Sequence, residues 1–115
     1  MAGYDLEKRT FQFAKNVSLF VKTISRTIAN IEYSKQLIIS SASIGANYIE
    51  ANESLGKKDF LMHVRISRKE AKGSIYWLRL ILEINENKIA MECKRLIIEA
   101  DELKKILSAI IEKLK

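Results

Sequence analysis

Residues 89–114 read IAMECKRLIIEADELKKILSAIIEKL. Apolar side chains recur in this stretch at spacings that alternate between four and three positions. This period places them on one face of an α-helix, while Lys and Glu fill the opposite face. The stretch therefore predicts one long amphipathic helix, with an apolar face made of Ile89, Cys93, Leu96, Ala100, Leu103, Leu107, Ile110 and Leu114.

The same kind of pattern occurs three times before it, and predicts further helices over residues 5–29, 35–53 and 57–85. Ser34 is the expected N-cap of the second helix, and Gly56 ends that helix or caps the third. Asn85 and Asn87 supply the last turn. Because the connections are short, we expect neighbouring helices to be antiparallel. The fold predicted is an all-α, antiparallel up-down four-helix bundle, with residues 1–115 as a single domain.

Length and composition agree with such a bundle. The chain has 115 residues, no proline, four glycines and one cysteine. A chain of this size buries roughly two thirds of the surface that it exposes when unfolded. The apolar runs are too short for a transmembrane helix, and the first residues lack the apolar centre of a signal peptide. The lone Cys93 excludes an intrachain disulfide and suits a reducing compartment, so we expect a cytoplasmic protein.

The predicted helix 57–85 is apolar on two opposite sides, at 100° per residue. Phe60, Val64, Ala71, Leu78 and Ile81 suit the core of the bundle. The opposite side needs a second partner, because exposed apolar patches usually mark interfaces. We interpret it as a homo-oligomer contact, although a central helix packed between neighbours of its own chain would give the same pattern. The interface candidates are Met62, Ile66, Trp77, Leu80 and Ile84.

The same helix carries most of the excess positive charge. The formal net charge is +6, and residues 57–82 hold seven Lys and Arg against two acids. Four of these cations recur every seven residues and so share one stripe of the helix. A cationic stripe suits phosphate contacts. A solvated face, or cations paired with carboxylates of the same chain, would give the same sequence pattern. The candidates for nucleic-acid binding are Lys58, Arg65, Arg68, Lys69, Lys72 and Arg79.

A second unusual feature is a nearly uncharged polar stripe on the predicted helix 35–53. It contains Gln36, Ser40, Ser43, Asn47, Glu50 and Ser54. A solvated face normally carries Lys and Glu, whereas small hydroxyl and amide groups suit close helix approach. We predict that Asn47 and Glu50 form a structural polar seam that controls helix packing or subunit register, with helix 57–85 supplying a basic partner for Glu50. An ordinary exposed polar face is the alternative.

No arrangement of residues indicates catalysis. His63 and Cys93 are the only residues of their kinds, so one chain cannot assemble a His/Cys metal cluster. The chain has neither a Glu-x-x-His pair nor a Gly-rich phosphate loop. Cys93 falls on an apolar face, where a buried thiol is expected, and His63 suits a solvated or capping role. We therefore expect no enzyme activity, no metal and no cofactor.

Three motifs follow one another along the chain: SASIGANYIEANES at 41–54, KKDFLMHVRISRKEAKGSIYWLRL at 57–80 and ADELKKILSAIIEKLK at 100–115. Together they resemble the four-helix-bundle proteins encoded in 23S rRNA intervening sequences, which are often labelled ribosomal-protein-like. The resemblance covers about residues 5–115. Family members often have a capping Ser at the position of Gly56. Gly is the weaker cap, by a few tenths of a kcal/mol.

The resemblance implies a small antiparallel bundle that assembles into rings, typically homopentamers. It also implies kinship with the accessory variability protein of diversity-generating retroelements, a basic barrel that binds nucleic acid and a reverse transcriptase. No activity is implied for the intervening-sequence proteins. The positions that match the family pattern, with no catalytic role attached, are Asn47, Glu50, Asp59, Phe60, Glu70 and Trp77.

These observations predict a non-enzymatic, oligomeric bundle that binds RNA or DNA electrostatically through the basic stripe. The alternative is a protein-interaction scaffold, whose basic stripe docks an acidic partner or a neighbouring subunit. Charge-based contact with phosphates is salt-dependent and tolerant of sequence. The sequence has few aromatic residues near the stripe, so base stacking is weakly supported.

Overall fold

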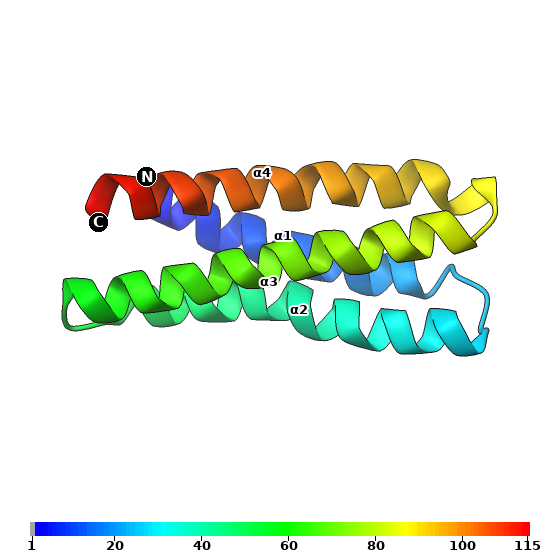
Figure 1. The fold of residues 1–115 in the computed structure, drawn as a ribbon, viewed down its shortest axis with the longest axis horizontal. Coiled ribbons are helices and arrows are strands. Elements are labelled where there is room, and N and C mark those ends of the chain that lie inside the picture. Colours follow the sequence, from blue (N-terminus) through cyan, green and yellow to red (C-terminus); the bar gives the residue numbers. More distant parts are fainter. Residues whose placement is uncertain (1) are drawn as a thin grey trace.

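Four helices run up and down beside one another in a computed structural model, which describes the backbone of residues 2–115 and the side chains from Leu6 onward (Figure 1). The helices are α1 (Ala2–Val21), α2 (Ile28–Asn52), α3 (Lys57–Ile84) and α4 (Ala90–Leu114), with a 3-10 turn at Asn87–Ile89 before α4. The bundle measures 45 × 21 × 20 Å. The predicted all-α, up-down four-helix bundle is confirmed.

Each helix packs on its neighbours in the chain, and α4 closes the bundle against α1. The contact between α1 and α4 is less extensive than the other three. One core cluster lies between the four helices, and its fully buried members include Phe13, Leu37, Ile44, Leu78 and Leu103. The apolar face predicted for the last helix is buried from Ile89 to Leu107. None of the helices described here is long and apolar enough to cross a membrane.

The first boundary differs from the one predicted. α1 ends at Val21, and α2 begins at Ile28 instead of residue 35. The N-cap is Thr27, whose hydroxyl oxygen accepts the Asn30 backbone N–H at 3.1 Å, and not Ser34. The apolar spacing misled the prediction because Ile24 stays buried although it lies in the connection. Burial alone cannot distinguish a helix from a loop that folds against the core.

The helix ends after the first connection agree with the prediction to within one residue, whereas α1 begins at Ala2, three residues before the predicted start. Gly56 is the N-cap of α3 and offers no side-chain hydrogen bond, while Asp59 lies in the first turn. Its carboxylate suits the positive end of the helix dipole. The apolar residues on the inner side of α2 are buried from Leu37 to Ala51, whereas Leu55 is fully exposed. The helix has already ended before Leu55, so this side chain no longer faces the core.

Gly45 allows α1 and α2 to approach closely. A Cβ atom at this position would lie 2.8 Å from Thr10 Oγ1 and 3.2 Å from Thr10 Cβ. Thr10 is buried, and its hydroxyl donates to the Glu7 carbonyl at 3.0 Å, so it has little freedom to move away. At Gly73, by contrast, an added Cβ would meet only Ser40 Cβ at 3.9 Å, which is an ordinary contact.

These contacts predict opposite effects of the same substitution at two helical glycines. Gly73→Ala should raise the free energy of unfolding by up to about 1 kcal/mol, because Ala is the better helix former. Gly45→Ala gains the same propensity but overpacks the contact with Thr10, at a cost of about 1–3 kcal/mol. Urea unfolding followed by circular dichroism should therefore rank Gly73→Ala above the parent and Gly45→Ala below it. Equal stabilisation of both variants would contradict the close approach at Gly45.

Candidate nucleic-acid interface

The predicted cations all lie on α3, and six of its seven Lys and Arg residues are exposed. Arg68 is half-buried. Lys57 was not among the candidates, but it lies in the first turn of the same helix and is exposed. We define the basic face of α3 as Lys57, Lys58, Arg65, Arg68, Lys69, Lys72 and Arg79.

No residue of this basic face makes an ion pair with a carboxylate among the side chains that the structure describes. Cations elsewhere are often paired: Arg9 reaches Glu99 at 2.7 Å, and Lys104 reaches Asp101 at 2.9 Å. Internal pairing was one alternative explanation of the stripe. Within the described part of the chain, the cations of α3 are instead left available to an external anion.

Arg68 is the one half-buried member of the basic face. The pKa of the Glu112 carboxyl is lowered mainly by its hydrogen bond to Lys115 and the charge of that lysine, and in smaller part by the charge of Arg68. The influence of Arg68 on a residue of α4 indicates that it lies at the α3–α4 edge of the basic face.

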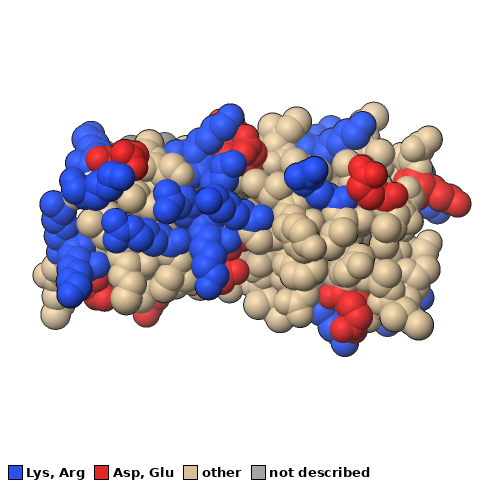
Figure 2. Space-filling model, viewed as in Figure 1, with Lys and Arg blue, Asp and Glu red and all other residues tan. Residues whose placement is uncertain are grey.

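The positive charge is concentrated on one half of the visible surface (Figure 2). In that view, Lys and Arg gather over the end of the bundle where α2 turns into α3, whereas much of the other half is uncharged. A groove of ≈ 810 Å³ lies within this region. The apolar residues that line it are Met62 and Ile66, and the charged residues are the acidic Asp59 and four cations, Lys57, Lys58, Arg65 and Lys69. The groove thus combines a mainly cationic rim with a small apolar floor.

The second apolar side of α3 is partly covered by its own chain. Met62 is 47% exposed and Ile84 is 50% exposed, while Ile66, Trp77 and Leu80 are half-buried. The Trp77 ring packs near Tyr33 of α2, with ring centroids 6.0 Å apart, and edge-on against Tyr76 at 5.1 Å. Intrachain packing therefore accounts for Trp77. The exposure of Met62 and Ile84 is what the prediction of an oligomer contact still rests on.

The polar seam is built differently from the way its prediction described. Glu50 is exposed and pairs with no cation among the described side chains, so the expected basic partner on α3 is not found. Asn47 is half-buried, and its amide donates to the Ser43 carbonyl of its own helix at 2.9 Å. The direct polar contact with α3 comes from Ser40, whose hydroxyl lies 2.9 Å from that of Ser74. A role of Asn47 and Glu50 in subunit register stays a prediction.

A second hydrogen bond joins α2 and α3 through a residue that sequence reasoning overlooked. The buried Ser67 hydroxyl donates to the Ile44 carbonyl at 2.7 Å. Together with the contact of Ser40 and Ser74, it puts small hydroxyl groups along the α2–α3 interface. Only the position of Ser67 and Ser74 on the buried face of α3 could have revealed this role, because Ser occurs as readily on solvated faces.

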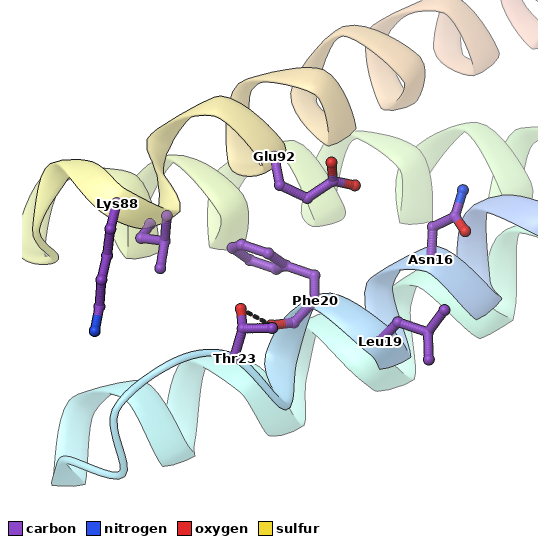
Figure 3. Close-up of a pocket in the computed structure, with 7 residues that line it drawn as sticks. Asn16, Leu19, Phe20, Thr23, Lys88 and Glu92 are labelled. Atoms are coloured by element: carbon purple, nitrogen blue, oxygen red, sulfur yellow. Dashed lines mark hydrogen bonds between the residues drawn. The ribbon is translucent and has the colours of Figure 1, made fainter.

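A separate cleft of ≈ 490 Å³ lies where α1 and α4 diverge near the 3-10 turn (Figure 3). The Phe20 ring points into it, with Asn16 at one end and Glu92 above. Thr23 donates to the Phe20 carbonyl at 2.7 Å, so its hydroxyl proton is already engaged (Figure 3). The cleft gathers no set of groups that suggests a nucleophile and its base.

His63 and Cys93, the only histidine and the only cysteine of the chain, lie in surroundings that indicate structural roles. His63 Nε2 lies 3.6 Å from the Asp59 carboxylate one turn earlier, while its Nδ1 is buried without a hydrogen-bond partner. Cys93 is buried, its thiol donates to the Leu78 carbonyl at 3.2 Å, and burial raises its pKa to about 11. Among the described residues, no group of three potential ligands could hold a metal ion.

The sequence from residue 4 to residue 109 matches the family model described as 23S rRNA-intervening sequence protein. The chain belongs to this family. A solved protein of unknown function from the S23 ribosomal protein family, from Bacteroides thetaiotaomicron VPI-5482, has a similar structure. The TM-score is 0.82 at 26% sequence identity, over 97% of this chain and 99% of that chain. No curated protein sequence matches this chain.

Membership of the 23S rRNA-intervening sequence protein family confirms the family that the motifs indicated. Within this chain, the motif residues around Ile44 have clear packing roles. Ile44 is fully buried, its carbonyl accepts from Ser67, and Gly45 provides the close contact with Thr10. The motif at residues 41–54 therefore holds α2 against α1 on one side and α3 on the other.

Proposed function

We propose that this protein binds nucleic acid through the basic face of α3 and acts as a binding protein rather than an enzyme. The observation that carries the proposal is the set of seven Lys and Arg residues on one helix, none of which is paired with a carboxylate among the described side chains. Unpaired cations on a rigid helix can contact successive phosphates and release condensed counterions.

The expected mode of binding is contact with the phosphate backbone and not the reading of bases. Lys and Arg contacts to phosphates position a protein on nucleic acid without conveying sequence information. The exposed aromatic residue near the end of the stripe is Tyr76, and it is already packed against Trp77. Stacking of bases on aromatic side chains would therefore contribute little, and the affinity should depend weakly on sequence.

The proposal includes self-association of the bundle. Exposed Met62 and Ile84 on the second apolar side of α3 are the structural support, and the family resemblance favours a homopentameric ring related to the accessory variability proteins. A ring would repeat the basic face in each subunit and increase avidity through multivalency. Light scattering on nuclease-treated protein tests this part, because a mass equal to one 13.2 kDa chain at all concentrations would contradict it.

The direct test is fluorescence anisotropy with labelled single-stranded RNA and duplex DNA across a series of salt concentrations. Binding should weaken linearly in a plot of log affinity against log salt, with a slope that grows by about 0.7 to 0.9 for each phosphate neutralised. The protein must first be treated with nuclease, because co-purified nucleic acid would occupy the site. Failure to bind either probe at low salt would contradict the proposal.

The groove around Met62 and Ile66 supports a second candidate function. A cationic rim around an apolar floor also suits an acidic amphipathic segment of a protein partner. In this alternative, the protein is an interaction scaffold and nucleic acid binding is incidental. Recovery of one stoichiometric protein in a pull-down after nuclease treatment, combined with weak binding of RNA and DNA, would favour the scaffold.

A further inference from the structure

The outward face of α2 is apolar over its central turns. Ile39 is 61% exposed and Ile49 is 47% exposed, and between them lie the exposed small residues Ala42 and Ala46. Along this line of residues the charged side chains stand at the two ends, as Lys35 and the C-cap Glu53, and the exposed Glu50 flanks it. We define the outer stripe of α2 as Lys35, Ile39, Ala42, Ala46, Ile49 and Glu53.

The neighbouring helix widens this apolar surface. Phe11 of α1 is 71% exposed and lines a groove of ≈ 360 Å³ together with Ala42, Ala46 and Ile49, and Glu7 and Lys15 of α1 also line this groove. Ile38, beside the stripe, is also exposed. A contiguous apolar patch on a small globular protein marks a surface that another molecule covers.

The order of residues along the outer stripe identifies the partner. The spacings are 4-3-4-3-4, which is the seam of a coiled coil and reads the same in both directions. The residue types are also symmetric about position 44, with Ile paired to Ile and Ala to Ala, whereas Lys at one end corresponds to Glu at the other. A helix of this kind is complementary to an antiparallel copy of itself.

We propose that a second copy of this chain covers the outer stripe, with two α2 helices packed antiparallel about a two-fold axis. The axis passes at the level of position 44, so Ala42 lies opposite Ala46 of the second copy. Ile39 then packs on Ile49 of the second copy, and Lys35 meets Glu53. Such an isologous contact uses one patch twice and closes on itself.

The charges at the ends of the stripe favour this orientation. Glu53 makes no ion pair with any described side chain, and Lys35 reaches only Glu32 on its own helix, at 3.3 Å. An antiparallel pair places two Lys–Glu contacts at the ends, whereas a parallel pair would oppose like charges. The small side chains at the centre let the two helices approach closely, so that Ile39, Ile49 and Phe11 are buried around them.

This contact does not depend on nucleic acid, because the outer stripe carries no cation between Lys35 and its far end. It is also separate from the second apolar side of α3, since the polar stripe with Ser43 and Asn47 lies between them along α2. The two surfaces can therefore be tested independently. The two-fold contact joins protomers, or rings, in pairs.

Cysteine crosslinking between two differently labelled chains tests the register. Ala42→Cys and Ala46→Cys are both exposed substitutions. Under a mild oxidant, a mixture of the two variants should form a covalent dimer between the different chains. Each variant alone should crosslink far less, because two identical positions are offset by about 6 Å along the paired helices, beyond disulfide reach. The parent chain is the control, since its Cys93 is buried.

Charge exchange gives a second readout. Lys35→Glu and Glu53→Lys should each raise the dissociation constant of the two-fold contact, by about threefold to tenfold. The double variant should restore it, as measured by sedimentation or light scattering over a wide range of concentration. A monomer at every concentration would overturn the proposal. So would crosslinks that form equally in each single variant, or an assembly in which the mixed crosslink never forms.

Discussion

Replacement of both Arg65 and Lys72 by Glu is expected to weaken the binding of single-stranded RNA by about tenfold or more at low salt. Both residues belong to the basic face of α3, both are exposed, and neither forms an ion pair with a described carboxylate. Removal of two phosphate contacts should also flatten the slope of log affinity against log salt by about 1.5. Because neither side chain supports the core, the melting temperature should change little.

A matched control separates this face from the effect of net charge. Lys22 and Lys88 are exposed and lie in the connections at the other end of the bundle, away from the α2–α3 turn (Figure 1). Lys22→Glu combined with Lys88→Glu changes the net charge by the same amount. This control should bind RNA nearly as well as the parent at moderate salt, where long-range effects are screened. An equal loss in both double variants would show that the basic face has no special role.

Asn30→Ala should lower the free energy of unfolding by about 2 to 3 kcal/mol. Asn30 is buried, and it exchanges two side-chain hydrogen bonds with Asn85, each of 2.8 Å. Its amide also donates to the Ser25 carbonyl at 2.9 Å. The substitution leaves the Asn85 side-chain oxygen without its donor, and such an unsatisfied group costs about 1–3 kcal/mol. The Asn85 amide still donates to the Ile81 carbonyl, and the Ser25 carbonyl still accepts from the Thr27 backbone N–H.

Chemical denaturation of three variants checks this expectation. Asn87→Ala is the control, because Asn87 is exposed and its change should stay within about 0.5 kcal/mol. In a double-mutant cycle, Asn30→Ala and Asn85→Ala should show a coupling of about 1 kcal/mol or more. Additive effects in the double variant would mean that the two amides stabilise the fold separately, and that their mutual hydrogen bonds matter little.

The contact between Asn30 and Asn85 also shows what could not be predicted from the sequence. The sequence indicated only a turn-forming role for Asn85, which is the commonest role of Asn outside helices. Asn30 and Asn85 are 55 positions apart, and nothing in the spacing of either segment indicates the other. Their contact ties the start of α2 to the end of α3, beside the connection whose boundary was predicted wrongly. The same long-range packing that buries Asn30 also keeps Ile24 buried outside a helix.

For the candidate site as well, the sequence predicted one part and the packing of the helices decided the other. The seven-residue recurrence of Lys58, Arg65, Lys72 and Arg79 was enough to place them on one stripe, because the geometry of a helix is local. Whether carboxylates from other helices neutralise that stripe depends on how the helices pack. The predicted pairing with Glu50 is not found. Arg9 and Glu99, which are 90 positions apart, form an ion pair that no local sequence pattern predicts.

Periodic apolar spacing was thus sufficient for the number and type of the helices, the helix ends after the first connection and most of the core, since each follows from which side of a helix avoids water. Which polar groups meet, where α1 ends, and which apolar residues remain uncovered depended on the packing of the four helices. Three features depended on packing in this way: the contact of Ser40 with Ser74, the close approach of Gly45 to Thr10, and the exposure of the outer stripe of α2. They arise from contacts between residues far apart in the chain, and the chemistry of one residue does not reveal its distant neighbour.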